Sequence, residues 1–252
     1  MAGIREVLHA RFVDHAYPSH THDAWTLLIV DDGVIRFGID RHEHGVLQSA
    51  VTLLPPHVPH DGRTTTPQGF RKRVLYLEPA VLDAARIGAA VDRPVMNDPL
   101  LRRRVGQLHE ALAAGTEDLE GQSRLAFLRE RLGQHLMRQV GSPWPRRDPV
   151  LARRLRALLD DHVREGVTLD DAAGLLQAHP AYLVRVFTQE YGIPPHLYLT
   201  GRRVDLARSL LLDGARPAEV AVAAGFYDQS HLTRHFRRML GTSPARYANS
   251  AH

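Results

Sequence analysis

The sequence predicts an α+β protein in which an antiparallel β-barrel with following helices precedes an all-α domain holding two helix-turn-helix units. Three observations predict this fold class. Short apolar runs broken by Gly, Pro and Asp fill residues 1–78, the apolar spacing becomes helical over residues 79–140, and one helical pattern occurs twice within residues 150–252. Residues 141–149, GSPWPRRDP, have three prolines and no periodicity, and they form the predicted linker. A chain of 252 residues is long enough for two domains of about 100–150 residues each.

The barrel is predicted from apolar segments that follow one another closely. Tight turns such as Asp31-Asp32-Gly33 separate the segments, as does a proline-rich stretch, PPHVPHDG. Closely spaced strands joined by such turns favour antiparallel pairing in a barrel or sandwich. The main segments are AWTLLIV (24–30), VIRFGI (34–39), SAVTLL (49–54) and RVLYLEP (73–79).

Two apolar stripes predict a pair of helices between residues 79 and 140. Within each stripe the residues lie three or four apart, so they share one helical face. Such a face should be buried against either the barrel or a partner subunit. We favour a homodimer, with residues 79–140 as its helical linker or dimerisation region. The stripes are Leu101, Val105, Leu108 and Leu112, then Leu125, Leu128, Leu132 and Leu136.

Composition narrows the class of protein. The chain has no cysteine, which excludes disulfides and thiolate metal sites. The N-terminus lacks the long apolar core of a signal peptide, and no window approaches the ~18 uninterrupted apolar residues of a membrane span. We therefore expect a cytoplasmic protein without a membrane partner. The net charge of +4 does not locate a nucleic-acid surface, but Arg234, Arg237 and Arg238 lie in a stretch without acidic residues.

One pattern occurs in two copies, YLVRVFTQEYGIPPHLY (182–198) and HLTRHFRRMLGTSPARY (231–247). A short helix with small residues precedes each copy, and Gly225 stands where the second turn begins, so each copy predicts a helix-turn-helix unit. The alanines of the preceding helices, Ala173 and Ala221, are 48 positions apart whereas the later matches are 49 apart, so the second turn holds one additional residue. The matches are Leu183, Arg185, Phe187, Gly192, Pro195 and Tyr198 with Leu232, Arg234, Phe236, Gly241, Pro244 and Tyr247.

The second helix of each unit has two predicted faces. The leucine and the phenylalanine of each copy lie four residues apart, so they form the buried face. The opposite face is expected to meet DNA; the alternative is an all-α repeat with a solvent-exposed arginine face. The expected DNA face consists of Ala181, Val184, Arg185 and Thr188 in the first copy and Ser230, Thr233, Arg234 and Arg237 in the second.

The second copy also contains the run Gly225, Phe226, Asp228, Ser230, Leu232, Arg234, Phe236, Gly241, Ser243, Pro244 and Tyr247. This run closely resembles the signature of the AraC/XylS family of bacterial transcription regulators, and the resemblance extends over about residues 148–247. It implies seven helices, two helix-turn-helix units in successive major grooves of double-stranded DNA, and no enzymatic activity. It leaves RNA polymerase open as a further partner. His179-Pro180 stands where the first unit of the family often has a helix begun by serine.

The resemblance places the base-reading helices at residues 180–190 and 229–240. Arg185 and Arg234 occupy the positions expected to reach base edges, where a bidentate arginine–guanine contact is worth about 1–3 kcal/mol of discrimination. The other expected contacts are Gln229, Ser230 and Thr233, which read bases or hold phosphates, and Arg237 and Arg238, which hold phosphates.

Histidines gather in two N-terminal stretches, SHTHDAW (19–25) and PPHVPHDG (55–62). This part of the chain resembles the cupin-like sensor domain that is often fused to such DNA-binding domains. We predict a polar pocket for a small-molecule effector, with side chains that offer hydrogen bonds and stacking. The predicted lining is His20, His22, Trp25, His57, His60 and Tyr76.

A transition metal held by His20, His22 and His60 is the alternative. The resemblance to metal-binding cupins implies it, because these two segments lie on neighbouring strands there, and imidazole suits transition metals. Two departures weigh against it: the expected glutamate after His22 is absent, and His57 replaces a glycine of the second motif. Histidines packed in the barrel without any ligand are the third possibility. We therefore predict an effector-controlled transcription regulator without a cofactor, and a metal-responsive sensor or enzyme as the alternative.

Overall fold

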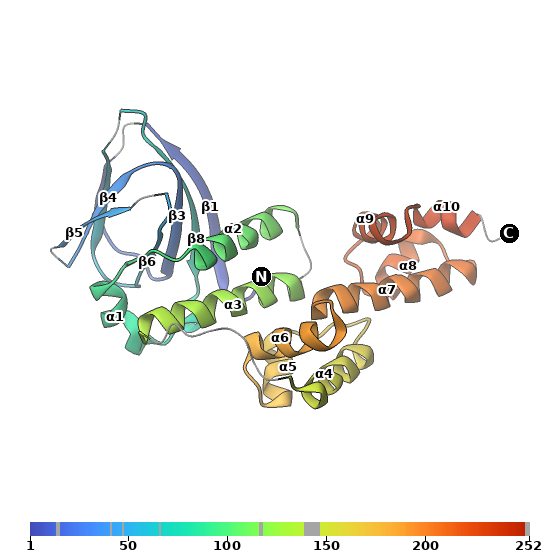
Figure 1. Cartoon of the computed structure of the whole chain (residues 1–252). Helices are drawn as coiled ribbons and strands as arrows, with labels where there is room; N and C mark the ends of the chain where they lie inside the picture. The colour runs from blue at the N-terminus through green and yellow to red at the C-terminus, as the bar shows by residue number, and fades with distance from the viewer. Residues whose placement is uncertain are drawn as a thin grey trace. The chain divides into compact units, whose positions relative to one another are not determined.

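The computed structural model describes residues 1–13, 16–40, 42–46, 48–65, 67–115, 118–138 and 147–249. The chain divides into two compact units, one drawn from residues 1–116 and 124–143 and the other from residues 117–123 and 144–252 (Figure 1). Most of the predicted linker, residues 141–146, lies outside the described residues. No helix of the described residues is long and apolar enough to cross a membrane.

The described strands of the first unit form two antiparallel sheets. One sheet has five strands in the order β1-β8-β3-β6-β9, and the other has four in the order β2-β7-β4-β5. The N-terminal part is therefore an antiparallel β-domain, as the short apolar runs predicted, and it is cupin-like, as the resemblance implied. The strands are β1 (Ile4–Phe12), β2 (Ala16–His20), β3 (Trp25–Gly33), β4 (Ile35–Ile39), β5 (His42–Val46), β6 (Val51–Leu54), β7 (His60–Thr64), β8 (Phe70–Leu77) and β9 (Val95–Met96).

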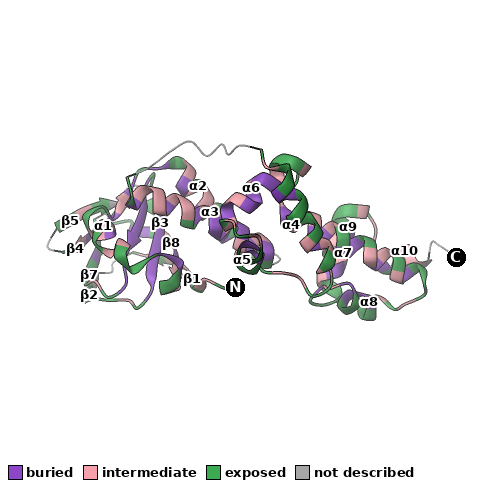
Figure 2. Ribbon diagram, turned by 90° about the horizontal axis from the view of Figure 1, so that it is seen from below, coloured by how far each residue is buried: buried purple, intermediate pink, exposed green. Residues whose placement is uncertain are grey.

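Strand β3 is buried on both of its faces, and most of its ribbon has the colour of buried residues in Figure 2. Because side chains alternate along a strand, the run AWTLLIV contributes to two separate cores. Leu28 and Val30 pack with residues of both sheets in the barrel interior. Trp25, Leu27 and Ile29 point to the other face of the five-stranded sheet and pack against the helices that follow the barrel.

Those helices are η1 (Pro79–Val81), η2 (Ala84–Arg86), α1 (Ile87–Asp92), α2 (Pro99–Ala113) and α3 (Asp118–Leu136). Both predicted stripes are buried in the core that holds Trp25, with Leu112 only partly buried at its edge. Of the two predicted locations, the stripes therefore occupy the one against the barrel. This packing removes the observation from which a homodimer was predicted.

Asp98 ties the start of α2 to the end of α3. Its carboxylate caps α2 by accepting hydrogen bonds from the backbone N–H groups of Leu100 and Leu101, at 2.9 and 3.1 Å. The same carboxylate lies 2.6 Å from Arg131 Nε and 2.7 Å from His135 Nε2. Burial alone would raise the pKa of Asp98, but the hydrogen bonds from His135 and Arg131 outweigh it and hold the pKa well below its usual range.

The second unit contains the seven helices that the family resemblance implied. The helices α5 and α6 form the first helix-turn-helix unit, α8 and α9 form the second, and α7 joins the two. Their bounds are α4 (Pro149–Asp161), α5 (Leu169–Leu176), α6 (Pro180–Tyr191), α7 (Pro195–Leu212), α8 (Pro217–Ala223), α9 (Gln229–Leu240) and α10 (Pro244–Asn249).

The residues that recur in the two sequence copies occupy equivalent structural positions in each. Phe187 and Phe236 are fully buried, and each meets the recurring tyrosine, with ring centroids 5.5 Å apart for Phe187–Tyr198 and 5.4 Å for Phe236–Tyr247. The recurring glycine ends each second helix in the left-handed conformation, with φ of 76° in one copy and 72° in the other. The repeat therefore reflects a repeated packing arrangement.

We expect Leu128→Ala to destabilise the first unit by about 2–5 kcal/mol, because it leaves a cavity between α3 and the sheet. Leu128 is fully buried. Urea unfolding followed by tryptophan fluorescence measures this, since Trp25 lies in the same core. The control is Met137→Ala, at a side chain that is 42% exposed, which should stay within about 0.5 kcal/mol of the parent. Equal effects of the two substitutions would contradict the packing of α3 on the barrel.

Candidate functional site

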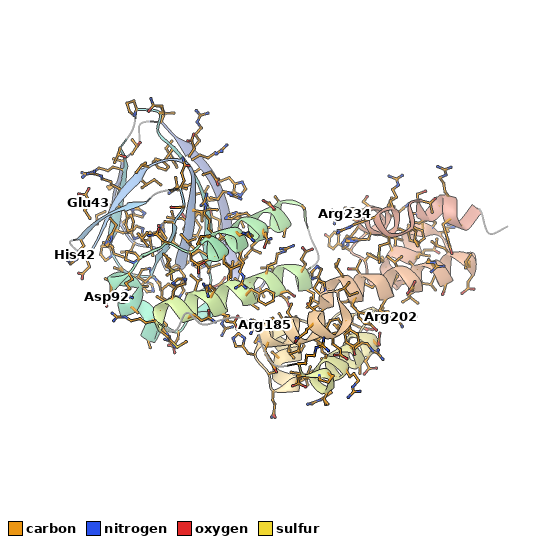
Figure 3. All side chains as sticks on the ribbon, viewed as in Figure 1. His42, Glu43, Asp92, Arg185, Arg202 and Arg234 are labelled. Carbon is orange, nitrogen blue, oxygen red and sulfur yellow. The ribbon has the colours of Figure 1, made fainter. Side chains whose placement is uncertain are left out.

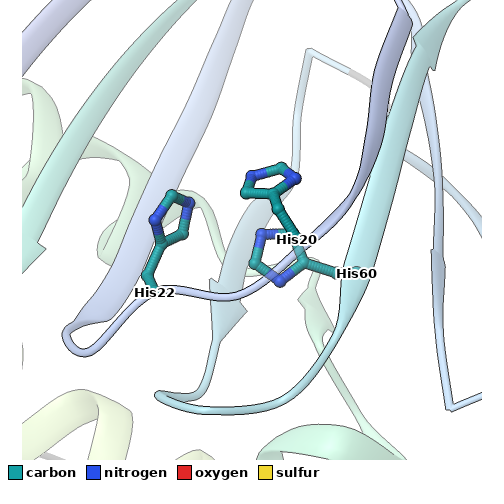
Figure 4. A group of neighbouring side chains, drawn as sticks. All are labelled: His20, His22 and His60. Carbon is teal, nitrogen blue, oxygen red and sulfur yellow. The ribbon is translucent and has the colours of Figure 1, made fainter.

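Three histidines converge in the barrel (Figure 4). His20 is the last residue of β2, His22 lies in the loop that follows, and His60 is the first residue of β7. His20 and His60 are directly paired across the two strands, which places their side chains on the same face. The ring centroids lie 4.6 Å apart for His20–His60, 4.9 Å for His20–His22 and 5.2 Å for His22–His60. One nitrogen from each ring lies within 4.8 Å of the others. We call these residues the histidine trio.

Hydrogen bonds to the main chain orient two rings of the histidine trio. His20 Nδ1 lies 2.7 Å from the carbonyl oxygen of Pro18, and His60 Nδ1 lies 3.1 Å from that of Val58. A carbonyl oxygen can only accept, so in the neutral imidazole Nδ1 carries the proton. In that tautomer Nε2 bears the lone pair of the ring.

Burial also favours the neutral form of two of these rings. It lowers the pKa of His60 to about 4, and the neighbouring His20, His22 and Lys72 act in the same direction while the bond to Val58 opposes it. The pKa of His22 is lowered as well, mainly by burial and next by His20. At neutral pH both rings can therefore accept a hydrogen bond or bind a cation.

The other three residues predicted for the pocket lie at different places relative to the histidine trio. Tyr76 lies beside the histidine trio, with its ring centroid 5.2 Å from that of His22. Trp25 does not: it is 1% exposed and faces the helices from the opposite side of the sheet, so its assignment to the pocket is wrong. His57 is exposed in the turn before β7, outside the histidine trio. Its φ of 61° is left-handed, which explains why related motifs place glycine there.

Sequence reasoning missed two interior polar residues. Thr26 pairs with Tyr76 in register, and its buried hydroxyl has no hydrogen-bond partner among the described residues. Lys72, the chain's only lysine, alternates with Phe70 and Val74, whose side chains face the interior. Its ammonium lies 6.0 Å from the Phe70 ring centroid, and burial lowers its pKa to about 8. Side chains alternate along a strand, so both residues could have been assigned to the interior once a residue two positions away was known to face it.

Helix α9 has three exposed arginines, Arg234, Arg237 and Arg238, whereas α6 has one arginine, the half-buried Arg185; Arg234 and Arg185 are labelled in Figure 3. Asp228 caps its N-terminus by accepting a hydrogen bond from His231 N at 2.7 Å. Burial lowers the pKa of His231, and it lowers that of His235 to about 4, so the arginines supply the positive charge of this helix at neutral pH. Of the predicted contacts, Thr233 is half-buried, and the exposed ones are Gln229, Ser230, Arg234, Arg237 and Arg238.

Helix α6 offers a smaller surface. Arg185 and Thr188 are half-buried, and the Thr188 hydroxyl donates a hydrogen bond to the carbonyl oxygen of Val184 at 2.7 Å. Ala181 and Val184 are 0% and 2% exposed, so their assignment to the DNA face is wrong. Both α4 and α5 pack against α6, and the buried face is therefore wider than the leucine and phenylalanine spacing indicates. His179 caps α6 through Nδ1, which accepts a hydrogen bond from the N–H of Ala181 at 3.2 Å.

Two models of known protein domains match the chain. The model of the AraC-like ligand binding domain matches residues 3–128, and the model of a helix-turn-helix domain matches residues 172–250. The chain belongs to the AraC family of transcription regulators.

Relatives of this AraC-family chain match it to different extents. YbfI of Bacillus subtilis, an uncharacterised HTH-type transcriptional regulator, is 26% identical over 86% of this chain and 81% of its own length. LumQ of Photobacterium leiognathi, a probable transcriptional regulator, is 30% identical over 35% of this chain and 36% of its own length. Among solved structures, the C-terminal domain of AraT from Geobacillus stearothermophilus is 31% identical and covers 42% of this chain and 88% of its own, with a TM-score of 0.39.

Family membership confirms several sequence predictions. The AraC-family chain is a DNA-binding transcription regulator with an N-terminal ligand-binding domain, and the family is not enzymatic. The individual contacts to DNA and to a ligand are not decided by these matches.

The additional residue in the second turn of this AraC-family regulator is Tyr227. The two turns correspond up to Ala178 and Phe226 and again at the capping residues His179 and Asp228, which leaves Tyr227 without a counterpart. Its side chain is 89% exposed at the N-terminus of α9. The change in spacing from 48 to 49 was the signal for this residue, although sequence reasoning gave it no role.

Gly225 shapes the same turn. Its φ is 84°, and a Cβ added there would lie 2.4 Å from the carbonyl oxygen of Arg164 and 2.9 Å from Arg203 Nε. A side chain at this position would therefore require both an unfavourable backbone conformation and a shift of neighbouring backbone.

We expect Gly225→Ala to destabilise the second unit by about 2 kcal/mol or more and to weaken binding to DNA that the parent selects from a random pool. The control is Gly174→Ala in α5, where an added Cβ has open space, and it should stabilise by at most about 1 kcal/mol. Thermal unfolding and gel-shift titration measure the two effects. An unchanged melting temperature in Gly225→Ala would show that this turn tolerates a side chain.

Proposed function

We propose that the protein is a sequence-specific regulator that reads its operator mainly through α9 and is controlled by a small ligand bound in the barrel. The exposed arginine face of α9 is the observation that supports the first part. The histidine trio supports the second, together with Thr26, which lies opposite Tyr76 and whose buried hydroxyl has no hydrogen-bond partner among the described residues. Both go beyond what membership of the AraC family establishes.

Within α9, Arg234 is the proposed base contact. It lies one helical turn after Ser230, so the two share the exposed side of the helix. Residues near the start of a recognition helix reach base edges, whereas those further along meet the backbone. Gln229, Ser230 and Thr233 accordingly read bases or hold phosphates, and Arg237 and Arg238 hold phosphates. Tyr227 is exposed at the same end of the helix, and its hydroxyl is proposed to donate a hydrogen bond to a phosphate oxygen.

Helix α6 makes the smaller contribution. Arg185 corresponds to Arg234 and Thr188 to Arg237, so the first unit offers one arginine where the second offers three. Phosphate contacts set affinity and its salt dependence, while base contacts set sequence preference. The second unit should therefore supply most of the electrostatic affinity, and Arg185 should add discrimination at a neighbouring part of the operator.

Control by a ligand requires that the ligand bind one arrangement of the regulator better than another. A difference of about 1–3 kcal/mol is typical of such coupling. The proposed ligand site consists of the histidine trio and Tyr76. Trp25 is not part of it, and His57 lies in the turn beside it. The chemical class of the ligand is taken up below.

Homodimerisation and contact with RNA polymerase remain proposals. Paired half-sites are the usual way in which such folds gain affinity for DNA. The leucine stripes are used within the first unit, so a dimer would need a different surface. Light scattering with and without operator DNA distinguishes a monomer from a dimer.

We expect Arg234→Ala to lose about 1–3 kcal/mol of binding to the preferred DNA and to relax discrimination at one base pair. Arg238→Ala should instead weaken specific and random DNA alike and reduce the salt dependence by about one phosphate contact. Fluorescence anisotropy at several salt concentrations measures both. If Arg234→Ala lowers affinity equally for specific and random DNA, Arg234 holds a phosphate and does not read a base.

We expect His22→Ala to abolish the effect of a ligand on operator binding while leaving basal operator binding intact. The half-buried side chain lies in a loop of the first unit, whereas α9 packs in a core of the second unit. The measurement is binding to the selected DNA with and without extract of the producing cells as a ligand source. His57→Ala, in the neighbouring turn, is the control. A response retained in His22→Ala would place the ligand elsewhere.

A further inference from the structure

The histidine trio has the nitrogen donors of a transition-metal site and lacks the oxygen donors of a magnesium or calcium site. It brings three imidazole nitrogens within 4.8 Å of one another and includes no carboxylate. Imidazole donors suit Zn, Cu, Ni, Co and Fe, whereas Mg and Ca require oxygen ligands. The interior also lacks the indole that was predicted to stack on an organic ligand, because Trp25 faces the other core.

The orientation of the rings is the second observation. Ligating histidines generally donate their other ring N–H to a carbonyl or carboxylate, which fixes the tautomer and directs the lone pair at the metal. His20 and His60 make this bond through Nδ1 to Pro18 and Val58. Because His20 and His60 are paired across adjacent strands, their Nε2 atoms belong to side chains on one face.

The size of the trio is close to what an ion needs. Zinc–nitrogen bonds of about 2.0–2.1 Å in a tetrahedral site place nitrogens roughly 3.4 Å apart. The ligand atoms of the trio lie within 4.8 Å, so they must move together by a further ångström or so. His22 lies in a loop, so its backbone can move toward the other two histidines without breaking the pairing of a strand.

We propose that His20, His22 and His60 bind one divalent transition-metal ion, and that the ion keeps an open coordination position for a small anionic ligand. Three donors from the chain leave at least one position of a four-coordinate ion open. An imidazole set without a carboxylate leaves the charge of the ion uncompensated, and Lys72 adds a cation to the same interior. Both features favour an anion as the additional ligand, and the buried Thr26 hydroxyl lies on the same interior face as Tyr76.

The inference rests on the proposed function only in taking this anion as the ligand that controls the regulator. Metal binding itself depends on the trio alone. The ion would act as a Lewis acid that holds the anion, so the barrel would need few other contacts to retain it.

The test uses the full-length chain without an affinity tag, freed of metal with a chelator and titrated with Zn²⁺ by calorimetry and with Co²⁺ by absorption. We expect one ion per chain and a tetrahedral Co²⁺ spectrum. His20→Ala and His22→Ala should each weaken binding by at least about a hundredfold, since loss of a mere outer partner already costs 10–100-fold. Sub-stoichiometric binding, or binding unchanged in both variants, would overturn the proposal.

His42→Ala is the matched control. His42 Nδ1 bonds to the carbonyl oxygen two residues earlier, at Asp40, just as His20 bonds to Pro18, but it does not belong to the trio. It should leave the affinity unchanged, and an equal loss there would contradict the assignment. His60 is 5% exposed and its replacement could unfold the barrel, so the two less buried histidines carry the test and circular dichroism checks their folding.

Azide tests the open position. Added to the Co²⁺-loaded chain, it should shift the absorption spectrum in a saturable way, and Lys72→Met should weaken that effect while Co²⁺ stays bound. An unchanged spectrum would overturn the open position.

Two outcomes separate this inference from the proposed function. If cell extract still alters operator binding by the metal-free chain but not by His22→Ala, the metal inference fails and ligand control stands. If the trio binds metal but no extract alters operator binding, ligand control fails and the metal site stands.

Discussion

The burial of β3 on both faces is the constraint on which the rest of the first unit depends. One face of this strand closes the barrel interior, and the other requires cover, which α2 and α3 provide with their apolar stripes. The interior face of β3 carries only Thr26 as a polar side chain among its buried residues, between Leu28 and the loop before the strand. Polar groups for a ligand must therefore come largely from other strands, and they come from the end of β2, the start of β7 and from β8.

This constraint also explains how far sequence reasoning could reach in the barrel. Runs of apolar residues broken by turns predicted the antiparallel strands correctly, because hydrogen-bonded pairing and turn chemistry are local. The run AWTLLIV does not alternate in polarity, so it does not reveal which of its residues faces inward, and a shift of one residue exchanges the two faces. Trp25 was placed on the wrong face for that reason. The helices α2 and α3, which begin only at Pro99 and Asp118, decide the matter by covering one side.

In the second unit the sequence repeat identified packing more reliably than recognition. In both copies the recurring leucine and phenylalanine are buried, the recurring glycine ends a helix, and the recurring tyrosine, which is half-buried, packs on the phenylalanine. Residues that differ between the copies determine the outer surface: Ser230 is exposed where Ala181 is buried, and Arg237 stands in place of Thr188. Periodicity shows which residues share a face, but the width of the buried face depends on how many neighbouring helices pack there. Ala181 and Val184 were misassigned because α4 and α5 both cover α6.

The histidines show the same distinction between local and tertiary information. His20, His42 and His60 each have Nδ1 near the carbonyl oxygen two residues before, so this geometry is a local property of the chain. It prepares a ring to offer its other nitrogen, and by itself it creates no site. Pairing of β2 with β7 brings two of these rings to one place, and the loop after β2 adds a third. The resemblance to metal-binding cupins could name these three residues, but the choice between an ion and an organic ligand depends on what surrounds them. Trp25 faces the other core, so the interior lacks the indole that an organic ligand could stack on, and Lys72 favours an anion as the additional ligand of an ion held by the trio. Both placements follow from the alternation of side chains along β3 and β8.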